Sequence, residues 1–152
     1  MWNEVISFVK IVIPSNSERV LMGIGGMIGA VASFLFGDID AAFTWLLVMT
    51  VIDYITGTIA SFKSGSWSSE QGFKGLFKKF FMFFVIALCN GIDQATHTDM
   101  LKDIAVFAYA INEAGSIIEN IELLGYGKLI PPFLKRGLEV IKEKEKELLK
   151  HD

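Results

Sequence analysis

The chain has 152 residues, of which 52% are hydrophobic and 20% are charged, and its formal net charge is −3 at pH 7. Its mean hydropathy is +0.47, whereas an average soluble chain carries about 25% charged residues and is less apolar. The net negative charge argues against nucleic acid as a partner. The single cysteine, Cys89, leaves no disulfide framework and no cysteine-based metal site. The length fits one domain.

Residues 1–19 predict a short N-terminal amphipathic arm. Apolar residues recur near helical spacing from Trp2 to Ile13, and Pro14 ends the run. This pattern is typical of a helix that lies on a membrane surface, with a frayed terminus as the alternative. The basic start and the cleavage site of an export signal are absent. Ser15 and Glu18 then have the spacing of a capping box, which predicts the start of the next helix.

Four apolar runs follow and predict an all-α integral membrane protein with about four transmembrane helices. They cover residues 20–37, 41–62, 76–92 and 104–118. The first two are long enough to cross a hydrocarbon layer of about 30 Å, and the third is long enough only if Lys78 and Lys79 extend to the membrane surface. The fourth has fifteen residues and contains Glu113, so a re-entrant or partly buried helix is its alternative. A soluble helical bundle is the alternative for the whole chain.

The basic residues predict the orientation of these spans. With the N-terminus inside, 13 of the 14 Lys and Arg residues fall in inner segments, and only Lys102 falls in an outer loop. This bias favours an even number of spans with both termini in the cytoplasm. The chain is thus expected to divide into an arm (1–19), a transmembrane domain (20–130) and a cytoplasmic C-terminal helix (131–152). That last helix is expected to be solvated or to act as a self-association stalk.

Asp53 is the most informative residue, because it interrupts the uncharged run 41–62 near its middle. An ionised Asp at this depth costs about 2.5–3.5 kcal/mol on insertion scales. Its side chain must therefore be protonated, hydrogen-bonded to another helix or in contact with water. We expect the sheltering helices to come from other copies of the chain. A neutral Asp that donates to a neighbouring helix is the structural alternative.

Small and polar residues form stripes on three of the predicted helices. One stripe on the second span contains Thr50, Asp53, Thr56, Gly57 and Ala60. One on the fourth contains Tyr109, Glu113, Ser116 and Asn120. On the first span, a ladder spaced by four residues is typical of close helix packing and contains Gly25, Gly29 and Ser33.

Three ordered motifs carry a resemblance to a known family. They are "DYITGTIASFKSG", "SSEQGFKGLFKK" and "NEAGSIIENIELLGYGKLIPPFLKRGLE". Over about residues 45–137 the chain resembles the bacteriophage holin family of the toxin-secretion and phage-lysis type. The matching positions on the predicted helices are Asp53, Thr56, Gly57, Glu113, Ser116, Glu119 and Asn120. Those in the cytoplasmic loop 63–75 are Ser68, Ser69, Gly72, Lys74 and Gly75, and Lys79 matches just after it. Gly125, Pro131 and Leu134 match beyond them.

The resemblance implies a non-enzymatic protein of the bacterial cytoplasmic membrane, with the lipid bilayer and other copies of itself as partners. Such proteins assemble and open pores or lesions that release an endolysin or a toxin, which they need not bind stably. It implies no cofactor and no metal, and the pore or oligomer interface would include Asp53, Thr56, Gly57, Glu113, Ser116 and Asn120.

The residues themselves leave two other functions open. A small proton or ion channel or carrier could use Asp53 and Glu113, since acids within a membrane often mark relays. A membrane scaffold without a pore could act through its C-terminal helix. Enzyme signatures are absent from the sequence: His97 and His151 have no third ligand at metal spacing, and the glycines near residue 25 do not follow a strand.

Overall fold

A computed structural model describes the backbone of residues 15–148, with side chains as far as Ile141 and those of Glu143 and Lys144 beyond it. The expected N-terminal arm lies almost wholly outside these residues. The described part is built from α-helices and one 3₁₀ turn, so the predicted all-α fold is confirmed. The chain divides into two compact units, Met1–Asp38 and Ile39–Asp152, and each is described here by itself.

The first unit contains one described helix, α2 (Asn16–Phe36). It starts at the predicted capping box: the Ser15 N–H donates to Glu18 Oε2 at 2.6 Å, and the Glu18 N–H donates to Ser15 Oγ at 3.4 Å. It ends at Gly37, whose φ of 65° lies in the left-handed region that glycine tolerates. None of its residues is buried within this unit.

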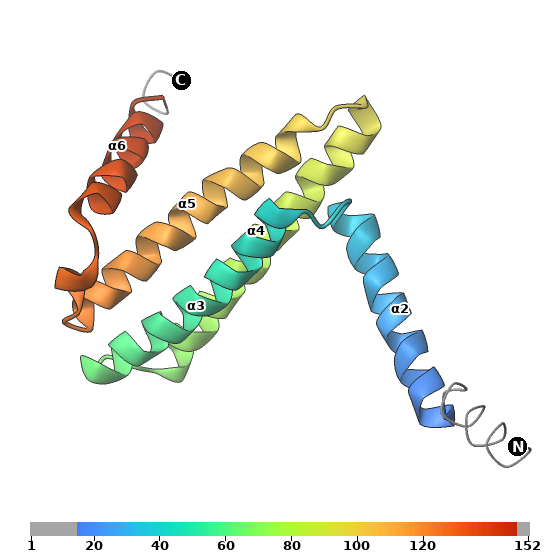
Figure 1. Ribbon diagram of the computed structural model, residues 1–152, viewed down its shortest axis with the longest axis horizontal. Coiled ribbons are helices and arrows are strands. Elements are labelled where there is room, and N and C mark those ends of the chain that lie inside the picture. The colour runs from blue at the N-terminus through green and yellow to red at the C-terminus, as the bar shows by residue number, and fades with distance from the viewer. Residues whose placement is uncertain (1–14, 149–152) are drawn as a thin grey trace, which may run out of the picture. The chain divides into compact units, whose positions relative to one another are not determined.

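The second unit contains α3 (Ala41–Lys63), α4 (Ser69–Thr96), α5 (Met100–Leu123), the turn η1 (Gly127–Leu129) and α6 (Pro132–Leu148). The long helices α3, α4 and α5 run lengthwise beside one another (Figure 1). Helix α5 packs most extensively along α3 and then along α4, whereas α3 and α4 touch each other much less. Short connections make successive helices antiparallel. The C-terminal ends of α3 and α5 therefore meet, and Lys63 Nζ donates to the Leu124 carbonyl at 2.5 Å. We call this end of the unit the Lys63 end.

The opposite end of the unit is closed by Asp93 in the last turn of α4, and we call it the Asp93 end. Asp93 is only 4% exposed, and its carboxylate accepts the backbone N–H groups of Leu101 and Lys102 at 3.2 and 2.8 Å. Asp93 follows the predicted apolar run 76–92 directly, but it still belongs to α4 and caps the N-terminus of α5, where an anion offsets the helix dipole. Asp99, which occupies the N-cap position, makes no side-chain cap bond.

Within residues 15–148, three helices are long and apolar enough to cross a membrane, namely α2, α3 and α4. Helix α5 is not among them by composition, although it lies alongside two of them. The expected loop 63–75 is wrong in extent, because only residues 64–68 lie between α3 and α4. Ser68 Oγ accepts the Gln71 N–H at 3.2 Å and starts α4. The remaining loop-motif residues are therefore helical: Ser69, Gly72, Lys74 and Gly75.

The large buried apolar side chains gather toward the Asp93 end. They lie in the first half of α3, from the middle of α4 onward and in the first half of α5, with exposures of 5% or less: Phe43, Leu46, Met82, Ile86 and Val106. The Phe43 and Phe83 rings meet edge to face, with centroids 6.0 Å apart. The Lys63 half of the three-helix contact buries smaller and more polar groups, and the candidate site lies there.

Candidate functional site

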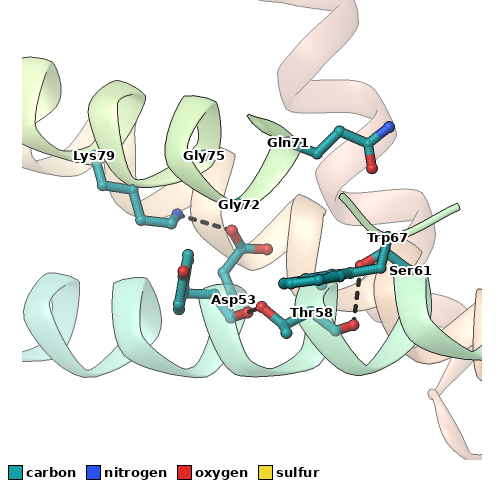
Figure 2. Close-up of a pocket in the computed structure, with 10 residues that line it drawn as sticks. Asp53, Thr58, Ser61, Trp67, Gln71, Gly72, Gly75 and Lys79 are labelled. Atoms are coloured by element: carbon teal, nitrogen blue, oxygen red, sulfur yellow. Dashed lines mark hydrogen bonds and ion pairs between the residues drawn. The ribbon is translucent and has the colours of Figure 1, made fainter. Parts of the chain in front are cut away.

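One lysine joins the two acidic residues of the polar stripes. Lys79 Nζ on α4 lies 2.8 Å from Asp53 Oδ2 on α3 and 2.5 Å from Glu113 Oε2 on α5. The three side chains are 11–15% exposed. Figure 2 shows Lys79 reaching from α4 toward Asp53 across the space between the two helices. The ion pairs therefore tie α3, α4 and α5 together at one point.

Asn120 on α5 completes this network. Its Nδ2 donates to Asp53 Oδ1 at 2.9 Å and to Thr56 Oγ1 at 3.2 Å. The approach is close because α3 has a glycine there: a Cβ on Gly57 would lie 3.3 Å from the Asn120 nitrogen. We refer to Asp53, Thr56, Gly57, Lys79, Glu113 and Asn120 as the charged network.

Helical spacing explains why these residues meet. Asp53, Thr56 and Gly57 share one face of α3, as the stripe on the sequence predicted. On α4 a matching face has three- and four-residue spacing and contains Gly72, Gly75, Lys79, Met82 and Ile86. This face of α4 is buried farther along the helix, at Met82 and Ile86. Lys79 lies on the same face, so its ammonium points inward.

The charged network places two carboxylates against one ammonium in a mostly buried position. Breaking such a pair is costly, because removal of one partner leaves an uncompensated charge away from water. Asp53 is well satisfied, since both carboxylate oxygens accept hydrogen bonds. Among the described residues, no fully buried side-chain nitrogen or oxygen is without a hydrogen-bond partner, and no three acidic, His or Cys side chains cluster as metal ligands.

The structure corrects two expectations about this region. Lys79 was expected to extend to the membrane surface together with Lys78, but only Lys78 is exposed while Lys79 turns inward to the two carboxylates. Other copies of the chain were expected to shelter Asp53, whereas its partners lie on α4 and α5 of the same chain. Two signals pointed to Lys79: it matches the family motif, and it lies on the Gly72–Gly75 face of α4.

Two cavities reach the charged network. One of about 230 Å³ lies between α3 and α4 and is lined by Tyr54, Thr58, Gly72 and Gly75 as well as by the network. The other, about 390 Å³, lies between α4 and α5 and is lined by Lys78, Tyr109, Asn112 and Ser116 as well as by the network. Asp53 and Lys79 line both cavities, so the ion pair forms part of a shared wall.

The remaining residues singled out in the sequence lie outside the charged network. Cβ atoms built on Gly25 and Gly29 meet nothing within 4 Å, and Ser33 on the same helix is not buried. Lys74 pairs with Glu70 at 2.7 Å, but both side chains are largely exposed. Ser69 is exposed at the start of α4. Trp67, between α3 and α4, stacks on Phe62 with ring centroids 4.6 Å apart.

Helices of membrane-spanning length and apolarity, together with a charged network inside their contact, define a helical membrane protein with several spans. The sequence model of the bacteriophage holin family matches residues 30–143. The chain belongs to this family, which confirms the resemblance drawn from its motifs.

Individual relatives are similar over most of their length. The chain is 37% identical to the uncharacterized protein Lin0175 of Listeria innocua over 126 residues, covering 82% of this chain and 89% of the relative. It is 32% identical to the uncharacterized protein BH0965 of Halalkalibacterium halodurans, covering 84% and 98%. It is also 32% identical to a probable holin of Bacillus phage phi105, covering 72% and 79%. No solved structure matches the chain.

Proposed function

We propose that this protein acts as a holin: it assembles in the bacterial cytoplasmic membrane and opens lesions through which an endolysin, or in some settings a toxin, leaves the cell. The action is non-enzymatic and needs no cofactor. The observation that carries the proposal is the family match over residues 30–143, supported by the similar phage protein whose name is probable holin.

In the proposed arrangement, α2, α3, α4 and α5 cross the membrane and both termini lie in the cytoplasm. The Lys63 end of the second unit then faces the cytoplasm. The orientation is supported by the concentration of basic residues in the segments assigned to the inside. The crossing of α5 is supported by its packing along α3 and α4. Helix α5 is less apolar than the other three, but its Glu113 is paired with Lys79 rather than exposed to lipid. This pairing lowers the cost of placing α5 in the membrane.

The charged network would hold the closed protomer together. Asp53, Thr56 and Gly57 form the α3 side of a contact whose other side carries Asn120. On opening, these groups and Glu113 and Ser116 would become hydrated or exchange their partners for those of neighbouring copies. The unburied small-residue ladder of α2, at Gly25, Gly29 and Ser33, would pack against a neighbouring helix of the assembly.

Co-expression with an endolysin tests the proposal. We expect culture turbidity to fall abruptly after a delay when both proteins are present, and no such fall with the endolysin alone. Asp53→Ala should shift the time of lysis and change the size of cross-linked oligomers. Unchanged timing together with unchanged oligomers would contradict the proposed role of Asp53.

A selective proton or ion conductor would give another result in the same experiment. The membrane potential would collapse while a cytoplasmic enzyme stayed inside the cell. Release of the enzyme therefore separates a large lesion from a narrow channel, and a scaffold without a pore would change neither quantity.

A further inference from the structure

The interior of the three-helix contact is divided into a polar half and an apolar half. Toward the Lys63 end lie the charged network and the two cavities of about 230 and 390 Å³. Toward the Asp93 end lie large apolar side chains with exposures of 5% or less, among them Leu46 and Ile86 at 0%. Because the helices are antiparallel, the two halves follow one another along the helix axes.

Both cavities offer polar groups to which water can bind. Polar side chains line both, including Thr58 and Gln71 in the smaller cavity and Asn112 and Ser116 in the larger. Each is large enough for several water molecules, which need polar partners of this kind. Water in contact with Asp53 and Lys79 also lowers the desolvation cost of two carboxylates facing one ammonium.

The apolar half of the described helices is filled by large buried side chains. Phe43, Leu46 and Val106 contribute buried side chains from α3 and α5, and the Phe43 ring meets Phe83 of α4. Beyond them, the Asp93 carboxylate accepts two backbone N–H groups from the N-terminus of α5. We refer to Phe43, Leu46, Met82, Ile86 and Val106 as the apolar plug.

We propose that each closed protomer contains a water-filled vestibule, open to the cytoplasm, which ends at the Asp53–Lys79–Glu113 ion pairs and is sealed from the outside by the apolar plug. This inference rests on the membrane orientation proposed above and deepens it. Cytoplasmic water and small ions reach the charged network, whereas the outer solution does not. The plug is then the layer that must separate before the helices of a protomer can rearrange with those of neighbouring copies into a lesion.

Cysteine labelling in sealed membrane vesicles tests the vestibule. The background variant is Cys89→Ser, which removes the only native thiol. Single cysteines are then placed at Thr58 and Ser116 in the two cavities, at Leu46 in the plug, and at the 50% exposed Ile59 on the outer face of α3. A charged thiol reagent that does not cross membranes is applied to inverted vesicles or to right-side-out vesicles, with Lys74→Cys as the control for cytoplasmic exposure.

We expect Thr58→Cys and Ser116→Cys to react in inverted vesicles within about tenfold of the rate of Lys74→Cys, because water supports the reactive thiolate. Neither should react in right-side-out vesicles, and Leu46→Cys and Ile59→Cys should react in neither preparation. Absence of labelling at both cavity positions in inverted vesicles, or equal labelling from both sides, would overturn the vestibule. Labelling only in right-side-out vesicles would overturn the orientation on which it rests.

The labelling result is independent of lysis. A chain that shows the expected labelling but never releases endolysin would retain the vestibule and lose the holin proposal. A chain that lyses cells on schedule but shows no labelling at Thr58→Cys and Ser116→Cys would retain the holin proposal and lose the vestibule.

Discussion

Removal of the Lys79 ammonium should destabilise the protein strongly, because it leaves Asp53 and Glu113 without their shared cation. The lysine contacts both carboxylates, at 2.8 and 2.5 Å, and all three side chains are at most 15% exposed. Removal of one member of such a buried ion pair costs about 3–5 kcal/mol. We therefore expect Lys79→Met to lower the free energy of unfolding by about this amount.

Lys74→Met is the matched control. It removes the same charge from the same helix, but its ion pair with Glu70 has side chains that are 69% and 77% exposed. Exposed pairs of this kind contribute about 0–1 kcal/mol. Reversible unfolding of the purified protein in mixed micelles, with increasing denaturing detergent, measures both variants on one scale.

A second comparison isolates the charges from the packing of the lysine stem. Adding Asp53→Asn and Glu113→Gln to Lys79→Met removes the two unpaired carboxylates, so this triple variant should recover most of the lost stability. The reasoning would be refuted if Lys79→Met were no less stable than Lys74→Met, or if the triple variant were less stable than Lys79→Met alone.

Three further substitutions probe the surroundings of the charged network. Gly57→Leu should lower the free energy of unfolding by about 1–3 kcal/mol through overpacking, because a Cβ there already lies 3.3 Å from the Asn120 side-chain nitrogen. Unfolding in micelles measures this loss, and an unchanged stability would contradict the close contact. Asp93→Ala should cost about 1–2 kcal/mol through loss of the α5 cap, whereas Asp99→Ala should cost less, since its side chain makes no cap bond; equal losses would rule out the assigned cap. Leu46→Ala should lower the free energy of unfolding by about 2–5 kcal/mol and make lysis start earlier, because it removes buried side-chain volume from the apolar plug. Leu47→Ala, at a 40% exposed position, should shift the time of lysis less. A later onset of lysis for Leu46→Ala would argue against the plug.

Much of the helical layout could be predicted from the sequence because uninterrupted apolar runs have few alternatives. The run at 41–62 differs from α3 by one residue, and the capping box at Ser15 is the start of α2. The start of α4 was missed because Ser68, Ser69 and Glu70 were interpreted as loop composition. The same residues supply an N-cap and a first-turn acid, which are signals of a helix start.

The charged network could be predicted only in part. The stripes on α3 and α5 followed from spacing alone, and both acidic residues belong to the network. Lys79 was assigned to the membrane surface because a lysine at the edge of an apolar run usually extends there. Its inward direction depends on which face of α4 meets α3 and α5, which no single helix pattern specifies.

The cap of α5 illustrates a second limit. Asp93 accepts N–H groups eight and nine residues later in the chain. The turn between them begins at His97, the C-cap of α4, which has a left-handed φ of 55°. Local cap rules look three residues ahead and point to Asp99 instead. The actual partner depends on how tightly α4 turns into α5, which is a property of the tertiary structure.

The claim that the motif residues join helices of one and the same chain can be measured directly by disulfide trapping. A Cβ on Gly57 would lie 3.7 Å from Asn120 Cγ, so Gly57→Cys and Asn120→Cys, combined with Cys89→Ser, should be close enough to form a disulfide on mild oxidation. We predict an oxidised monomer whose mobility on a denaturing gel returns to normal on reduction. Dimers from mixed single-cysteine variants, with no cross-linked monomer from the double variant, would contradict the account.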